Sequence, residues 1–122
     1  MNEILNLTQH MVTESQIKDG VIEPTEKDKQ IIKELLTFDE IPKVSELVSR
    51  AKKLSIIAVS YGVDKVMIGG APYLMTYLEQ ELLSNDMKFV YSFSKRISKE
   101  VEKDGKVTKV NVFEHIGFVE IV

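Results

Sequence analysis

The sequence predicts an α/β fold, and three observations lead to that prediction. Short apolar segments alternate with segments of helical periodicity along the first two thirds of the chain. The last third is β-rich and contains Asp104-Gly105, a pair favoured in type I′ hairpin turns. The length of 122 residues suits one domain, spanning residues 1–122. Parallel pairing through right-handed crossovers predicts a small Rossmann-like three-layer sandwich, with a mostly parallel sheet extended by a C-terminal antiparallel hairpin.

The N-terminal third is expected to contain one short strand and two helices. Residues 4–7 (ILNL) have the composition of a strand. Thr13 to Gln16 has the T-x-x-Q form of a capping box, so a short helix should begin there and end at Gly20. Thr25 follows Pro24 and is the expected N-cap of a second helix. The apolar residues of this helix fall at helical spacing: Ile31, Ile32, Leu35 and Leu36.

A longer helix is predicted from Val44 to about Tyr61, after Pro42 and before Gly62. One apolar stripe runs along it, and the charged residues lie off that stripe. The stripe consists of Val44, Leu47, Val48, Ala51, Leu54 and Ala58. This stripe is expected to be core.

The next segment predicts strand, turn, helix and strand in succession. The strand covers residues 65–68, and Gly69-Gly70-Ala71 forms the turn. Pro72 stands near the first helical position, where its missing N–H is tolerated, and the helix should stop near residues 84–86. A strand is predicted over residues 88–93 (KFVYSF).

Composition restricts the classes of function. The formal net charge of −3 argues against binding of long nucleic acid, which usually requires a basic face. The absence of cysteine excludes disulfides and thiolate zinc sites, and two histidines make a histidine-rich metal site improbable. We therefore expect no metal and no cofactor. No segment has the apolar length of a membrane span, and Glu3 stands where a signal peptide would be basic, so a cytoplasmic protein is expected.

Polar residues follow three of the predicted strands. Because ligands of open parallel sheets bind beyond the carboxyl ends of the strands, these residues are expected to converge on one edge. They suit a phosphate, since the turn offers backbone N–H groups at a helix N-terminus and the last strand offers hydroxyls and charge. The candidate ligand-binding residues are Thr8, Gln9, Gly69, Gly70, Ala71, Tyr73, Ser92 and Ser94, and the candidate catalytic residues are His10, Lys95 and Arg96.

Each of these features also has a purely structural interpretation. The glycine turn lacks the dinucleotide fingerprint and the P-loop lysine, so it equally fits a tight turn that lets helix pack on strand. Lys95-Arg96 fits a solvated pair, and His10 fits a cap of the short helix. His115 lies in an alternating β segment and is interpreted as a cross-strand residue. No G-x-S-x-G or H-E-x-x-H motif is present, so conventional hydrolase chemistry has no support in the sequence.

Two segments resemble a known family. The opening ILNLTQHMVTESQ and the central MIGGAPYLMTYLEQELLSNDMKFVYSFSKR are similar to the start and the middle of small CRISPR-associated Csx-type proteins. Together they cover about half of the chain. The resemblance implies a Rossmann-like fold akin to CARF domains, which bind cyclic oligoadenylate and in some members cleave it as ring nucleases. Short chains with the NLTQH opening also resemble products of phages and mobile elements.

The resemblance carries over to the strand-end residues: His10 with Thr8 and Gln9, the Gly69-Gly70 turn, and Ser94-Lys95-Arg96. The expected function is binding of a cyclic oligoadenylate second messenger in anti-phage signalling by a homodimer, leading to sequestration or to metal-independent cleavage. In cleavage, a ribose 2′-OH would attack the adjacent phosphate, with His10 as acid or base and Lys95 or Arg96 stabilising charge. The competing expectation is a non-catalytic interaction protein of a phage or mobile element, acting on a host or phage protein through the helix at 25–37 or the C-terminal hairpin.

Overall fold

The chain forms one mixed sheet with the strand order β2-β1-β3-β4-β5 in the computed structural model, which describes residues 3–121. The first four strands in this order pair in parallel, and β5 pairs antiparallel with β4. The strands are β1 (Ile4–Asn6), β2 (Val21–Ile22), β3 (Lys65–Ile68), β4 (Lys88–Lys103) and β5 (Lys106–Glu120). The helices are α1 (Glu14–Lys18), α2 (Glu26–Leu36), α3 (Val44–Ser60) and α4 (Pro72–Ser84). The predicted fold class is confirmed.

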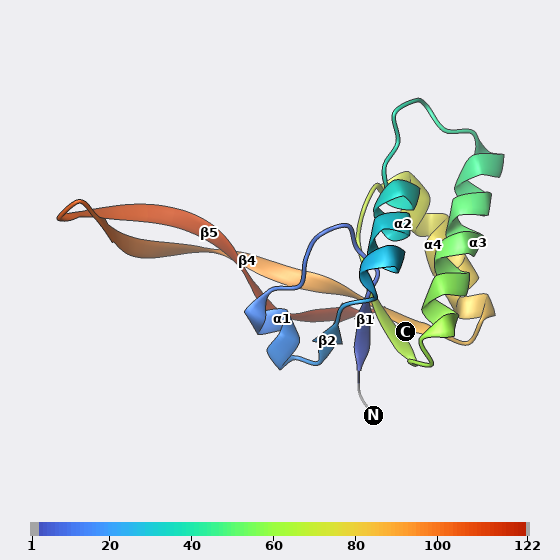
Figure 1. Cartoon of the computed structure of the whole chain (residues 1–122), viewed down its shortest axis with the longest axis horizontal. Helices are drawn as coiled ribbons and strands as arrows, with labels where there is room; N and C mark the ends of the chain where they lie inside the picture. The colour runs from blue at the N-terminus through green and yellow to red at the C-terminus, as the bar shows by residue number, and fades with distance from the viewer. Residues whose placement is uncertain (1–2, 122) are drawn as a thin grey trace.

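Helices cover both faces of the sheet, and most of the core lies on one of them (Figure 1). Alternate strand residues point to opposite faces. Leu5, Val66 and Phe89 pack with buried residues of α2, α3 and α4 in the larger cluster. Their neighbours Ile4, Met67 and Val90 form the smaller cluster on the other face, the side on which α1 lies. The α3 stripe is core as predicted, since Leu47, Ala51, Leu54 and Ala58 are buried, although Val44 is exposed.

The predicted helix starts are present in atomic detail. The Thr13 hydroxyl accepts from the Gln16 N–H, and the Gln16 side chain accepts from the Thr13 N–H, which completes the capping box of α1. Thr25 caps α2 by accepting from the Asp28 N–H. These local bonds fix where the connections between strands turn into helices.

Two features of the sheet differ from the sequence-based expectation. The two-residue β2 was not predicted, because a strand that short carries no periodicity of its own. β4 does not end at Phe93 but continues ten residues further, since β5 pairs with it from Val90 to Lys103. The tight turn between them has the expected geometry: Asp104 and Gly105 both have positive φ, 53° and 74°, as a type I′ turn requires.

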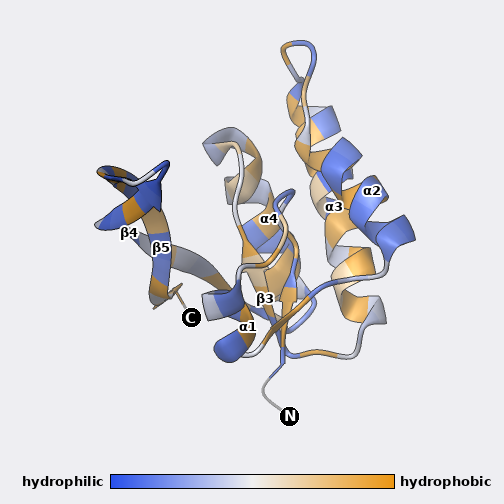
Figure 2. Cartoon of the chain, turned by 60° about the vertical axis from the view of Figure 1, so that its left-hand side comes forward, coloured by the Kyte–Doolittle hydropathy of each residue, from blue (hydrophilic) through white to orange (hydrophobic). Residues whose placement is uncertain are grey.

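The outer part of this hairpin, residues 94–116, projects away from the rest of the molecule, and we refer to it as the arm (Figure 1). A register shift between Phe93 and Ser94 marks its base. Hydrophobic and hydrophilic residues alternate along it (Figure 2). Among its residues, Val101, Val107, Val110 and Phe113 are large, apolar and exposed.

Candidate functional site

The strand order determines where a site is expected in this fold. The chain passes from β1 to β2 on one side and then crosses back to β3 on the other side of β1, so the switch point of the sheet lies between β1 and β3. A hollow of about 320 Å³ opens at the carboxyl ends of the strands there. Its lining comes from the segments that follow β1 and β3, from β4 and from α1: Thr8, Gln9, His10, Gln16, Met67, Ile68, Gly69, Gly70, Tyr91, Ser92 and Ser94. We refer to it as the strand-end hollow.

Most of the predicted site residues come together in this hollow, although they belong to three distant parts of the sequence. Four do not line it: Ala71, Tyr73, Lys95 and Arg96. The Tyr73 ring instead packs edge-on against Phe38, with 5.4 Å between ring centroids. Lys95 and Arg96 stand at the base of the arm, immediately after Ser94, and point to opposite faces of it.

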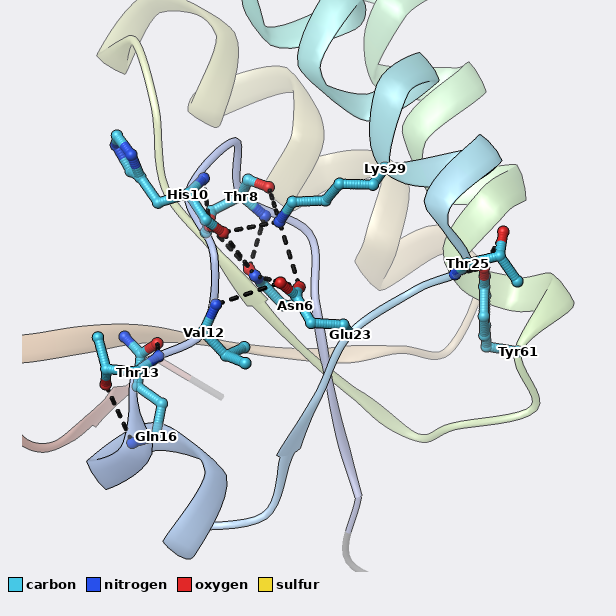
Figure 3. Close-up of polar contacts among 10 residues, drawn as sticks. All are labelled: Asn6, Thr8, His10, Val12, Thr13, Gln16, Glu23, Thr25, Lys29 and Tyr61. Carbon is cyan, nitrogen blue, oxygen red and sulfur yellow. Dashed lines mark hydrogen bonds and ion pairs between the residues drawn. The ribbon is translucent and has the colours of Figure 1, made fainter.

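The segment after β1 is held by a buried polar network (Figure 3). Asn6 is fully buried, and its amide nitrogen donates to the His10 carbonyl at 2.8 Å and to the Glu23 carboxylate at 2.7 Å. Its amide oxygen accepts from the N–H and from the hydroxyl of Thr8. The Thr8 hydroxyl is therefore engaged by Asn6, and the segment from Thr8 to His10 is fixed to the end of β1.

Lys29 of α2 completes this network. Its side chain is 9% exposed, and the ammonium donates to the carbonyls of Thr8 at 3.0 Å and His10 at 2.7 Å. It also lies 3.2 Å from the Glu23 carboxylate, which offsets the cost of burying its charge. The network uses backbone groups of His10, whereas the His10 ring is exposed and points away from it (Figure 3). The predicted helix cap at His10 is wrong, since Thr13 caps α1.

The glycine turn after β3 forms a second wall, beside Thr8. Gly70 has φ of +155°, a conformation that L-residues rarely adopt, and a side chain there would meet Met75 and Leu36. Across residues 3–121, neither the Gly70 nor the Ala71 N–H takes part in a backbone hydrogen bond. These groups precede the N-terminus of α4, whose dipole adds partial positive charge. This wall can accept an anion.

The third wall is β4. Gln16 of α1 donates to the Ser92 hydroxyl at 3.3 Å. Tyr91 donates to the Glu79 carboxylate of α4. Burial first, and then the hydrogen bond and negative charge of Glu79, raise the pKa of Tyr91 well above its ordinary range, so the phenol stays neutral. The hollow thus offers neutral donors and acceptors from β4.

Sequence reasoning missed several residues at this site. Gln16 was recognised only as half of a capping box, and Tyr91 only as part of a strand. His115 pairs with Ser94 across the hairpin, as a cross-strand residue should, but it is also buried and hydrogen-bonded to Ser92 and Asp19. Asp19 and His115 are 96 residues apart, so no local motif joins them.

An open, mostly parallel sheet with helices on both faces makes this chain a Rossmann-like α/β protein; its strand order, 2-1-3-4-5, is that of flavodoxin-like sheets, but its last strand is antiparallel. Residues 2–119 match the family described as the uncharacterized protein MJ1673 family, and the chain belongs to that family. Comparisons with curated proteins and with solved structures gave no match. None of the helices within residues 3–121 has the length and apolar character needed to cross a membrane.

Proposed function

We propose that this protein binds a cyclic oligoadenylate-type nucleotide second messenger in CRISPR or anti-phage signalling, and that it acts in the cytoplasm. The observation that carries the proposal is the strand-end hollow. Gly70, whose N–H makes no backbone hydrogen bond, lines a hollow that is also lined by the Thr8–His10 segment and by Ser92 and Ser94. Backbone N–H groups at a helix N-terminus suit phosphate, and hydroxyl and amide groups suit a ribose.

The size of the hollow supports a homodimer as the binding unit. A volume of about 320 Å³ is at the lower end of ligand sites, which span roughly 300–1,000 Å³. It suits one nucleotide unit of a ring better than the whole ring. A cyclic ligand with two-fold symmetry, such as cyclic tetra-adenylate, is matched by two such hollows related by a dimer axis.

In a cleaving enzyme, the reaction would be attack of a ribose 2′-OH on the adjacent phosphate, with the chain's own groups aligning the ribose. The turn N–H groups and Lys95 or Arg96 would stabilise the negative charge that develops on the phosphorus oxygens. The exposed His10 ring at the rim would supply the acid that protonates the leaving 5′-oxygen. A binder without turnover would sequester the messenger.

Thermal unfolding with and without ligand tests the binding proposal. Cyclic tri-, tetra- and hexa-adenylate, linear oligoadenylates and ATP are compared at equal nucleotide concentration. A ligand present at about 100 times its Kd stabilises the folded state by about 2.7 kcal/mol, which raises the Tm by several degrees. A Tm raised by a cyclic oligoadenylate and not by ATP supports the proposal, and an unchanged Tm with every cyclic compound contradicts it.

A second candidate function is supported by the arm. The arm projects from the rest of the molecule (Figure 1), and its exposed apolar residues, such as Val107 and Val110, need a partner surface if they are to be covered. This observation favours the non-catalytic interaction protein that acts on a host or phage protein. The same nucleotide screen separates the candidates, because an interaction protein predicts no change of Tm with any nucleotide.

A further inference from the structure

Three side chains from three elements form a continuous chain of hydrogen bonds beside the strand-end hollow. Nδ1 of His115, on β5, lies 2.6 Å from Oγ of Ser92, on β4. Nε2 of the same ring lies 2.9 Å from Oδ2 of Asp19, the C-cap residue of α1. The order is hydroxyl, imidazole and carboxylate, which is the arrangement that activates a hydroxyl by removing its proton.

The surroundings of the ring determine where its protons lie. The His115 side chain is 0% exposed and packs against Phe118, with 4.7 Å between ring centroids. An ionised carboxylate only accepts hydrogen bonds, so the Nε2 atom that faces Asp19 carries the hydrogen of the neutral ring. Nδ1 then has a free lone pair, and the Ser92 hydroxyl donates to it. The Asp19 carboxylate stabilises the imidazolium that forms when Nδ1 takes this proton.

Ser92 connects this chain to the hollow. It lines the hollow together with Thr8 and Gly69, and its oxygen accepts a hydrogen bond from Gln16 at 3.3 Å. A network that only attached α1 to the sheet would not need its hydroxyl end on the wall of a ligand-sized hollow. His115 itself is enclosed and can reach a ligand only through Ser92.

We infer that Ser92, His115 and Asp19 form a proton relay for cleavage of the bound cyclic oligoadenylate; this inference depends on the proposed function. Within the relay Ser92 is the catalytic residue, whereas His115 and Asp19 are positioning residues that act through it. The ribose 2′-OH gives its proton to Ser92 Oγ as Ser92 gives its own proton to His115 Nδ1. The 2′-oxygen–phosphorus bond forms, and the bond from phosphorus to the 5′-oxygen breaks.

The remaining proton and charge also balance. The 5′-oxygen takes a proton from the His10 imidazolium, so the products are a 2′,3′-cyclic phosphate and a free 5′-hydroxyl. The reaction is an exchange of ester bonds, and neither water nor an oxidant is consumed. Exchange with solvent returns a proton to His10 and removes one from His115, which resets the site.

The relay requires a neutral His115 ring and the negative charge of Asp19, which contacts the ring from α1. On β4, Arg96 stands two residues beyond Ser94 on the same face, and on β5 Glu114 points to the opposite face. Asp19→Asn removes the negative charge in contact with the ring and should lower the single-turnover rate with little change in Kd, whereas a purely structural role would affect binding and rate together.

The experiment measures binding and single-turnover cleavage of cyclic tetra-adenylate by the full chain. The variants are Ser92→Ala, Ser92→Thr, His115→Gln and Asp19→Asn. Ser98→Ala is the control, because Ser98 lies on the same face of β4 but on the arm, outside the hollow. Ser92→Ala and His115→Gln should lower the cleavage rate by about 10²–10⁴-fold, with Kd within about tenfold of wild type, the effect of losing one neutral hydrogen bond. Ser92→Thr should restore part of the rate, and Ser98→Ala should not change it.

The outcomes separate the relay from the proposed function. If wild type binds and cleaves, and Ser92→Ala cleaves equally fast, the relay is wrong and binding stands. If wild type binds but never cleaves, the relay is also wrong, and sequestration stands. If wild type does not bind cyclic tetra-adenylate or any other cyclic oligoadenylate, both proposals fail. Should His115→Gln not fold by circular dichroism, Ser92→Ala and the partly exposed Asp19→Asn decide the question.

Discussion

The Lys29 ammonium of α2 donates a 2.7 Å hydrogen bond to the backbone carbonyl of His10, and so joins a helix of the larger core to the edge of the strand-end hollow. Replacement by Met would leave Glu23 and two carbonyls without this donor. Because an unpaired buried acceptor or charge is costly, Lys29→Met should lower the free energy of unfolding by about 2–4 kcal/mol in urea denaturation. Lys33→Met, on the exposed face of α2, is the control. If the two variants lose equal free energy of unfolding, the buried network does not stabilise the fold through Lys29.

The two glycines of the turn should respond differently to substitution. A Cβ at Gly70 would lie 3.3 Å from Met75 Cε, and its φ of +155° strains any other residue. Gly70→Val should therefore lower the free energy of unfolding by about 1–3 kcal/mol. A Cβ at Gly69 would meet only Thr8 Cγ2, at an ordinary 3.7 Å, so Gly69→Ala should unfold at the wild-type urea midpoint. Since it narrows the hollow, it should weaken nucleotide binding about tenfold or more by calorimetry. Unchanged binding would indicate that the turn serves packing alone.

The two cations at the base of the arm should contribute unequally to binding. Arg96 points to the same face as Ser92 and Ser94, and its guanidinium lies 5.5 Å from the centre of the Phe113 ring. Lys95 points to the other face, opposite Glu114 in the register. Arg96→Ala should weaken cyclic tetra-adenylate binding by about 1.5–3 kcal/mol, as for loss of a charge-assisted bond, and Lys95→Ala by less than about 1 kcal/mol. If the double variant binds as wild type does, the pair is only a solvated surface feature.

The role of His10 is measurable apart from that of the relay. Its ring is exposed at the rim of the hollow, so His10→Ala should leave the free energy of unfolding within about 0.5 kcal/mol of wild type. Because His10 is the acid for the leaving oxygen, its replacement by Ala should lower the rate of single-turnover cleavage by about two to four orders of magnitude, with little change in Kd. A wild-type rate in His10→Ala would remove His10 from the mechanism.

One ion pair near the C-terminus makes the stability of the fold depend on pH, and the direction of that dependence follows from the pKa of Glu120. The Lys65 ammonium lies 2.6 Å from the Glu120 carboxylate and lowers the pKa of Glu120 in the folded state. A lowered pKa means that this contribution to stability is complete above the unfolded-state value and is lost as pH falls through the folded-state value. In a carboxyl NMR titration, Lys65→Met should raise the pKa of Glu120. Lys88→Met should raise it less, because Lys88 acts only through weaker charge attraction. The reverse order would contradict the assignment.

The helix starts and the hairpin turn were predictable because the residues that define each of them are close together in the sequence. The capping box at Thr13, the cap at Thr25 and the Asp104-Gly105 turn each depend on residues within four positions of one another, and all are present in the structure. The length of β4 was not predictable from its own composition, since Arg96, Lys99 and Glu102 read as the polar end of a strand. They remain in the sheet because residues of β5 face each of them in the antiparallel register, with backbone hydrogen bonds at alternate pairs.

The site was predictable in part for a similar reason. The rule that ligands bind at strand ends was enough to bring Thr8, Gly69 and Ser92 together from sequence. It could not supply the connection from Ser92 through His115 to Asp19, because that connection depends on how the C-terminus of α1 packs against β5. It also could not indicate that Tyr73 turns towards Phe38, since two aromatic residues one helical turn apart look alike in a sequence.

The arm has a consequence for the behaviour of the protein in concentrated solution. Within residues 3–121, β4 pairs with β3 only as far as Tyr91, so both edges of the arm present unpaired backbone groups beyond that point. Such edges, next to exposed residues like Val110, are templates for strand addition and aggregation. Charged side chains on an edge oppose such pairing, and lysine recurs along the arm at positions 95, 99, 103, 106 and 109. Strand addition would have to desolvate these ammonium groups, so the solubility of the folded protein depends on the two edges of this single hairpin.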